Sequence, residues 1–85
     1  LQRRYDVMPS TDVGRAETNT VVLQNATISR QHAKIKQEKG QFTLFDLGSA
    51  NGSFVNDQRV SEPVILKDGD IVRFGELEFL FKCLT

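Results

Sequence analysis

The chain contains few of the residues that form disulfides, metal sites or membrane spans. Its one cysteine, Cys83, cannot form an internal disulfide, which excludes the disulfide-stapled secreted domains and favours a reducing, intracellular (cytoplasmic or nuclear) location. No apolar stretch approaches the ~20 residues that a membrane-spanning helix needs, so we expect no membrane insertion. One histidine and one cysteine fall short of the usual zinc ligand set, so we expect no metal and no other cofactor.

An excess of charge is also missing. Eleven Lys and Arg balance eleven Asp and Glu, for a formal net charge of +0, so no overall field draws the chain to nucleic acid or to an anionic membrane. Trp is absent, whereas the six Phe suit a buried core better than a platform for stacking bases. With 85 residues, the chain is expected to be a single domain (residues 1–85) that belongs to a longer protein.

The apolar residues follow the period of a β-strand. They recur at every second position in short runs separated by Gly, Asn and Asp, and no window keeps the 3.6-residue period of a helix. This pattern predicts an all-β fold. The predicted hairpins join 33–36 to 42–46, 54–55 to 59–60 and 71–74 to 77–83, with a further strand at 64–66.

Three phenylalanines fall where these strands need buried side chains. Phe42, Phe79 and Phe81 are therefore predicted to lie in the core of a sandwich. The first 13 residues show no regular pattern, and 9–12 (Pro-Ser-Thr-Asp) are predicted to form a loop.

Polar residues gather at the edges of three apolar runs. Gly14 and Arg15 form the first cluster, residues 29–32 (Ser-Arg-Gln-His) the second, and Asn51 with Gly52 the third. Cations, a hydroxyl and a carboxamide in loops suit the capture of a phosphate group, which carries about −1.5 to −2 charges and three acceptor oxygens. Taken alone, however, Arg15 would more often be an arginine in a surface salt bridge.

Four separated motifs resemble those of the forkhead-associated (FHA) domain. They lie at 14–15, 28–33, 45–56 and 66–75 and read GR, ISRQHA, FDLGSANGSFVN and LKDGDIVRFG. The match covers residues 13–81, and it is specific because the motifs occur in the right order at plausible spacings. The resemblance implies an FHA/SMAD-like β-sandwich of about eleven short, mostly antiparallel strands, with loops at one end that bind phosphothreonine peptides.

The resemblance also implies which residues contact the ligand. Arg15 and Ser29 would bind the phosphate, because a guanidinium forms paired hydrogen bonds with phosphate oxygens and a hydroxyl can donate one more. Arg30 either adds a second charge to the phosphate or faces solvent. Asn51 would hold the peptide backbone through its carboxamide. Ala50 departs from many members of the family, which carry a hydroxyl residue there, so Ala50 can offer only its backbone.

The remaining motif residues are expected to support the loops. Ser29, His32 and Asp46 suggest a catalytic triad, but no Gly-x-Ser-x-Gly motif surrounds the serine and no oxyanion-hole segment is evident, so we predict no enzyme. In the resembling family this histidine braces the binding loops. The supporting residues are Gly14, which would give the turn freedom to aim Arg15, together with His32, Gly52 and Asn56.

The predicted function is therefore phosphorylation-dependent recognition of a protein or peptide that contains phosphothreonine, without binding to nucleic acid. The alternative is a phosphate-independent structural or oligomerisation module with the same sandwich. Ala50 and the irregular first 13 residues permit this alternative, because an opening strand near residues 5–7 could be short, displaced or shared with a partner chain. The sequence leaves the oligomeric state open.

Overall fold

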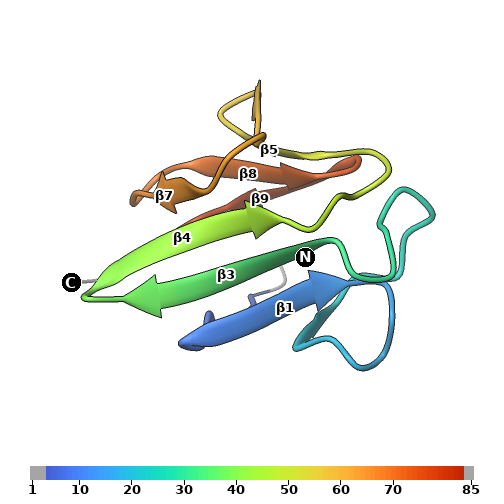
Figure 1. The fold of residues 1–85 in the computed structure, drawn as a ribbon, viewed down its shortest axis with the longest axis horizontal. Coiled ribbons are helices and arrows are strands. Elements are labelled where there is room, and N and C mark those ends of the chain that lie inside the picture. Colours follow the sequence, from blue (N-terminus) through green and yellow to red (C-terminus); the bar gives the residue numbers. More distant parts are fainter. Residues whose placement is uncertain (1–3, 84–85) are drawn as a thin grey trace.

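A computed structural model describes residues 4–83, which form two β-sheets packed face to face (Figure 1). The five-stranded sheet has the strand order β2-β1-β3-β4-β7, and the four-stranded sheet has the order β6-β5-β8-β9. Within residues 4–83 no helix is long and apolar enough to cross a membrane. The strands are β1 (Ser10–Gly14), β2 (Val21–Val22), β3 (Ala33–Glu38), β4 (Gln41–Asp46), β5 (Ser53–Val55), β6 (Gln58–Arg59), β7 (Val64–Leu66), β8 (Ile71–Phe74) and β9 (Leu77–Leu80).

The predicted all-β sandwich is confirmed. The described part of the chain has nine strands rather than about eleven, and the pairing of β1 with β2 is parallel whereas the other strand pairs are antiparallel. No strand forms at residues 4–8, near the segment 5–7 where the sequence allows a short, displaced or shared opening strand. Tyr5 and Val7 pack against the core instead, and the Tyr5 ring meets the Phe79 ring edge to face, with centroids 6.0 Å apart.

The predicted hairpins form around turns that accept a left-handed backbone. The β3–β4 turn contains Lys39 (φ 52°) and Gly40 (φ 77°), and the β5–β6 turn contains Asn56 (φ 49°) and Asp57 (φ 67°). Positive φ at both central residues matches the twist of two-residue hairpins, and glycine, asparagine and aspartate tolerate it best. These turns fix the register of both hairpins.

The prediction of a loop at 9–12 is wrong, because β1 begins at Ser10. This strand pairs with β3 from Ser10 opposite Lys36 to Val13 opposite Ala33. Although β1 is polar in composition, its residue Thr11 faces the core and is only 1% exposed. The Thr11 hydroxyl accepts a hydrogen bond from the Met8 amide (2.8 Å) and donates one to the Met8 carbonyl (3.1 Å). A threonine whose hydroxyl bonds locally can occupy a core position.

The core lies between the two sheets and includes residues from the loops. Leu23 and Ile28, which lie between β2 and β3, are 4% and 1% exposed and are buried with Leu44 of β4. Phe81 is buried as predicted, and Phe42 and Phe79 are partly buried against the same cluster. Anchoring the β2–β3 loop by two apolar side chains holds its polar residues in place at the end of the sandwich.

Candidate functional site

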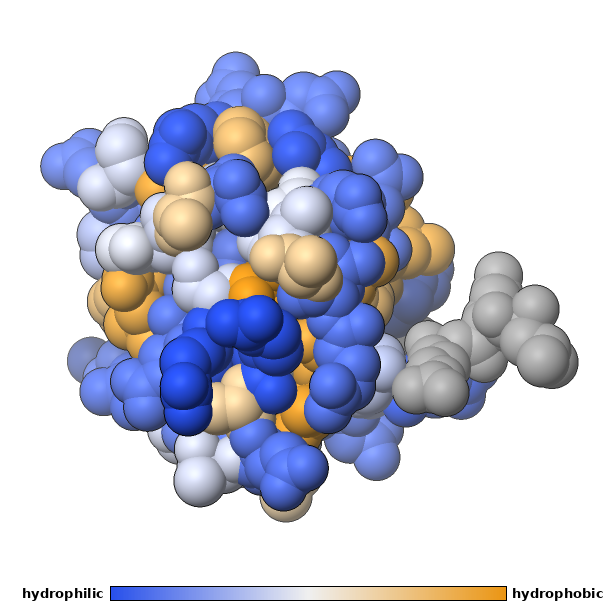
Figure 2. Space-filling model, turned by 90° about the vertical axis from the view of Figure 1, so that its right-hand side faces the viewer, coloured by the Kyte–Doolittle hydropathy of each residue, from blue (hydrophilic) through white to orange (hydrophobic). Residues whose placement is uncertain are grey.

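Three loops meet at the end of the sandwich that lies on the right in Figure 1. They are the β1–β2 loop (15–20), the β2–β3 loop (23–32) and the β4–β5 loop (47–52). Figure 2 views the molecule from this end and shows strongly hydrophilic residues over the centre of the face. The three polar clusters found in the sequence are therefore brought together.

Backbone hydrogen bonds hold the β1–β2 loop against the β2–β3 loop. The Arg15 amide donates to the Ser29 carbonyl (3.0 Å), and the Ala16 amide donates to the Arg30 carbonyl (3.1 Å). Because their backbones are fixed in this way, the side chains of Arg15 and Arg30 start from neighbouring positions.

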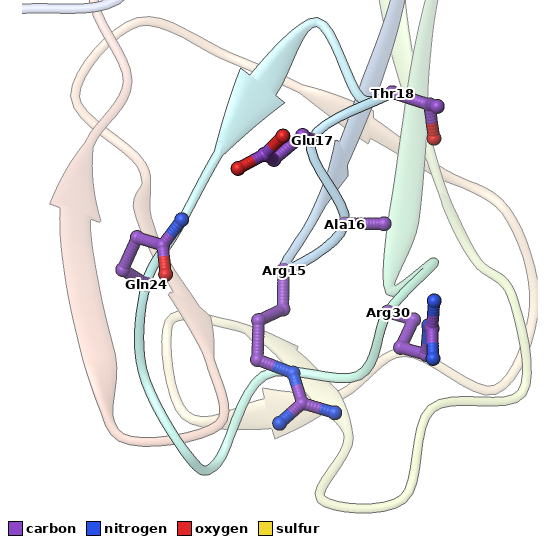
Figure 3. A pocket seen from close by; sticks show the side chains of 6 residues that line it. All are labelled: Arg15, Ala16, Glu17, Thr18, Gln24 and Arg30. Atoms are coloured by element: carbon purple, nitrogen blue, oxygen red, sulfur yellow. The ribbon is translucent and has the colours of Figure 1, made fainter.

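Arg15 and Arg30 line an open pocket. The same pocket is lined by Ala16, Glu17, Thr18 and Gln24. Figure 3 shows the Arg15 side chain reaching toward the segment between Gln24 and Arg30. The Arg30 guanidinium extends to the other side, away from Arg15, while the Glu17 carboxylate points toward Gln24. Both arginines are exposed, and among residues 4–83 neither guanidinium group has a carboxylate within salt-bridge distance. The pocket thus presents two arginines that form no salt bridge with an acid of the described chain, although Glu17 also lines it.

Gly14 is required by a close backbone contact. A Cβ atom at this position would overlap the carbonyl oxygen and carbon of Arg30 and would lie 2.7 Å from Asn19 Nδ2. Gly14 does not have a positive φ, so the predicted need for turn freedom is wrong. Its missing side chain lets the Arg15 and Arg30 loops approach each other.

Asn19 fastens the same two loops and was not singled out in the sequence. Its Nδ2 donates to the Ala16 carbonyl (2.8 Å) and to the Arg30 carbonyl (2.7 Å). An asparagine in a polar loop gives no local sign of such a role, because both acceptors are backbone atoms and one of them is 11 residues away.

The Ser29 hydroxyl is fixed by the β4–β5 loop. The Ala50 amide donates to Ser29 Oγ (3.0 Å), so the hydroxyl acts as the acceptor and keeps its own proton for another partner. The backbone of Ala50 thus positions a candidate phosphate donor, and this contact does not depend on the side chain at position 50.

His32 is fully buried beneath these loops. Its Nδ1 accepts from the Ser29 amide (3.0 Å), so the ring proton lies on Nε2, which donates to the Gly52 carbonyl (2.9 Å). The ring also packs edge to face on Phe74, with centroids 5.6 Å apart. With 0% exposure and both nitrogens in use, His32 joins two loops and does not reach the pocket.

These contacts do not form a nucleophile–base pair. It is the Ser29 amide that faces His32, while the Ser29 hydroxyl bonds to Ala50. Asp46 accepts from other serines and has no hydrogen bond to the histidine among the described contacts. A triad needs the hydroxyl on the imidazole and the imidazole on the carboxylate.

Asp46 organises the β4–β5 loop. Its Oδ1 accepts from the hydroxyls of Ser49 and Ser53 (2.6 Å each), and its Oδ2 accepts from the amides of Gly48 (3.1 Å) and Ser49 (3.0 Å). Ser49 Oγ in turn accepts from the Gly52 amide (2.9 Å). Partial burial alone raises the pKa of Asp46, but the hydrogen bonds from Ser49 and Ser53 outweigh it and hold the pKa below its usual value.

Asn51 is exposed beside the Ser29 loop. Its Nδ2 donates to the Thr27 carbonyl (2.8 Å), which ties the β4–β5 loop to the β2–β3 loop. This bond uses one of its two amide hydrogens, and within residues 4–83 the Oδ1 atom has no hydrogen bond. Asn51 can therefore brace the loops and still offer an acceptor and a donor to an extended peptide.

Asn56 acts elsewhere, in the β5–β6 turn. Its Nδ2 donates to Asp70 Oδ1 (3.0 Å), and its Oδ1 accepts from the Ile71 amide (3.0 Å). Asp70 Oδ2 also accepts from the Lys67 amide (2.8 Å). Asn56 thus ties the turn to the loop before β8 and is not among the residues that line the Arg15 pocket.

Comparison with known proteins links this arrangement to one family. The FHA domain model matches residues 11–75. The glycogen accumulation regulator GarA of Mycolicibacterium smegmatis is 37% identical over 73 residues, which cover 86% of this chain and 46% of GarA. The oxoglutarate dehydrogenase inhibitor of Corynebacterium diphtheriae is 38% identical over 74 residues, which cover 86% of this chain and 50% of that protein. The chain thus spans about half the length of these two relatives.

A solved structure shows a similar fold with a ligand. The structure of Mycobacterium tuberculosis EmbR in complex with a low-affinity phosphopeptide superposes with a TM-score of 0.84 at 38% identity, covering 87% of this chain and 20% of EmbR.

Proposed function

The chain belongs to the FHA domain family, and we propose that it binds phosphothreonine in an extended peptide and so mediates phosphorylation-dependent protein–protein interaction. The observation that carries this proposal is the pocket with Arg15 and Arg30, where neither guanidinium is paired with a carboxylate of the described chain. A phosphate supplies the missing negative charge and the acceptor oxygens.

Each proposed ligand contact uses a side-chain group that still has a donor or acceptor free after the contacts within the loops. The guanidinium of Arg15 forms paired hydrogen bonds with two phosphate oxygens, and the proton of the Ser29 hydroxyl goes to an oxygen of the same group. Arg30 lines the pocket together with Arg15, which favours a second charge on the phosphate over the alternative of an arginine that only faces solvent. Asn51 then bonds the peptide backbone beside the phosphoresidue.

The proposal also covers the longer protein that contains the domain, its lack of catalytic activity and its cellular location. Residues 1–85 form a single FHA domain of a longer protein, as the partial coverage of its relatives supports. The domain is a binding module without catalysis, in line with the separation of the Ser29 hydroxyl from His32. A free thiol at Cys83 fits an intracellular location.

Calorimetric titration with three matched peptides tests the proposal. We expect binding of a phosphothreonine peptide and much weaker binding of its phosphoserine and unphosphorylated forms. Arg15→Ala should weaken binding by about 1.5–3 kcal/mol, roughly 10- to 150-fold, because charged hydrogen bonds at an exposed arginine are lost. Lys36→Ala, which removes an exposed cation on β3, is the matched control and should leave the affinity unchanged.

Two results would contradict the proposal. Equal binding of the phosphorylated and unphosphorylated peptides would instead support the phosphate-independent module with the same fold. An Arg15→Ala variant that binds as tightly as the Lys36→Ala control would show that the pocket is not the phosphate site.

A further inference from the structure

A row of four side chains crosses the outer face of the four-stranded sheet. Arg59 on β6 lies opposite Phe54 on β5, Phe54 lies opposite Arg73 on β8, and Arg73 lies opposite Glu78 on β9. Residues opposite each other in antiparallel strands project from the same face with Cβ atoms about 4.5–5.5 Å apart. The row therefore forms one continuous strip of cation, ring, cation and acid.

The Phe54 ring holds both guanidinium groups. Arg73 Cζ lies 3.9 Å from the ring centroid and Arg59 Cζ lies 5.8 Å from it, and Arg73 Nη1 also donates to the Gly75 carbonyl (2.8 Å). Although Glu78 faces Arg73 in register, neither arginine has a salt bridge among residues 4–83. Two like charges on one ring repel each other, and an anion from outside would relieve that repulsion.

Exposed apolar side chains occupy the next row of the same face. Ile71 on β8 lies opposite Leu80 on β9, and these residues are 38% and 56% exposed. We call the five residues Phe54, Arg59, Ile71, Arg73 and Leu80 the Arg59 face. Its combination of cations and aliphatic groups matches a protein segment that carries both carboxylates and apolar side chains.

The Arg59 face begins next to the phosphothreonine site. A Cβ atom on Gly52 would lie 3.2 Å from Arg59 Cζ, so this guanidinium rests against the residue that follows Asn51. From Arg59 Cζ through Gly52 and Ala50, standard chain geometry allows no more than about 17 Å to the Ser29 hydroxyl. That distance is spanned by about five residues of extended peptide.

We propose that the Arg59 face binds an acidic segment, with apolar residues among its carboxylates, of the same phosphoprotein that occupies the Arg15 pocket. This inference rests on the proposed function, because the phosphothreonine holds the partner while the acidic segment adds a second, phosphate-independent contact. A nucleic acid fits this face less well, because Glu78 lies at the end of the arginine row and the chain has no excess positive charge.

Tailed phosphopeptides test the second contact. A minimal phosphothreonine peptide is extended, on one side or the other, by a five-residue Gly/Ser linker and a Glu-Leu-Glu-Leu tail, with a Gln-Leu-Gln-Leu tail as the neutral match. In one of the two orders the acidic tail should tighten binding about three- to tenfold over the neutral tail, as expected for exposed ion pairs held at high local concentration. Arg59→Gln should abolish that gain, whereas the control Lys36→Gln should keep it. Both variants should bind the minimal peptide equally.

A gain that survives in Arg59→Gln, or no gain in either order, would overturn the proposal. A second measurement is independent of the phosphate pocket: the unphosphorylated acidic tail at millimolar concentration should shift the NMR signals of the Arg59 and Arg73 side-chain Nε–Hε groups. If the minimal phosphopeptide does not bind, the proposed function is wrong. The NMR shifts still test whether the Arg59 face binds the acidic tail. Equal shifts with a single-stranded DNA of the same charge would overturn the assignment to an acidic protein segment.

Discussion

Replacing His32 by alanine should destabilise the domain by about 3–5 kcal/mol. The substitution removes two hydrogen bonds, to the Ser29 amide and the Gly52 carbonyl, and empties the space beside Phe74. Each buried group left without a partner costs about 1–3 kcal/mol, and the cavity adds lost packing, although relaxation of the loops recovers part of both. Since small domains have about 5–15 kcal/mol of stability in all, His32→Ala should be near the limit of folding.

Urea unfolding followed by circular dichroism measures this loss. With a slope of about 1 kcal/mol per molar urea, typical of small domains, the midpoint should fall by several molar relative to the wild type. Gln31→Ala is the control, because Gln31 is the exposed neighbour in the same loop and should change stability by less than about 0.5 kcal/mol. His32→Asn can restore one acceptor for the Ser29 amide and should give an intermediate value.

A loss below about 1 kcal/mol in His32→Ala, at an unchanged slope, would refute this account of His32. It would mean that the two loops hold their positions through their backbone bonds without the imidazole. Loss of amide-exchange protection at Ser29 in His32→Ala, but not in Gln31→Ala, would support the bond read from the structure.

Two further predictions concern Gly14 and the hydrogen bond from Ser53 to Asp46. Gly14→Ala should weaken phosphopeptide binding at least about tenfold and lower stability, because its Cβ would overlap the Arg30 backbone. The control Gly40→Ala places its Cβ in open space at a positive φ, so it should cost about 1 kcal/mol of stability and leave binding unchanged. Equal binding by both variants would contradict the role of Gly14. Since the pKa of Asp46 is lower in the folded than in the unfolded chain, its stabilising contribution is present above the usual value of 3.8 and is lost as the pH falls further. Ser53→Ala should weaken this acid dependence in a series of urea unfolding curves between pH 2 and 6, and an unchanged dependence would show that Ser53 does not set the pKa.

The hairpins could be predicted because their information is local. Alternating apolar residues define β3 and β4, and Asn56 with Asp57 marks the turn after β5. The first strand could not be predicted in this way, because Ser10 and Thr11 look like loop residues until the pairing with β3 and the bond from the Thr11 hydroxyl to Met8 are known. The two residues of β2 are too few to show any period.

The same contrast between local and long-range information applies to the candidate site. The motifs identify Arg15, Ser29 and Asn51 as candidates because side chains of these types bind phosphates and peptides wherever they are exposed. The motifs do not reveal Asn19, or the bond from Asn51 to Thr27, because these contacts join loops that are far apart in sequence. The close approach of Gly14 to Arg30 is likewise visible only in three dimensions.

The loop contacts explain how this small domain could recognise a phosphate without rearranging. Asn19, His32 and the Ala50 amide bond to groups within the loops, so the backbone around the pocket is fixed before a ligand arrives. The groups left available for the phosphate are the two guanidinium groups of the pocket and the proton of the Ser29 hydroxyl. Ordering loops on binding reduces affinity, so a pocket held by internal hydrogen bonds retains more of the interaction energy of the phosphate. Variants that loosen these bonds should therefore weaken binding even though none of the altered side chains touches the peptide.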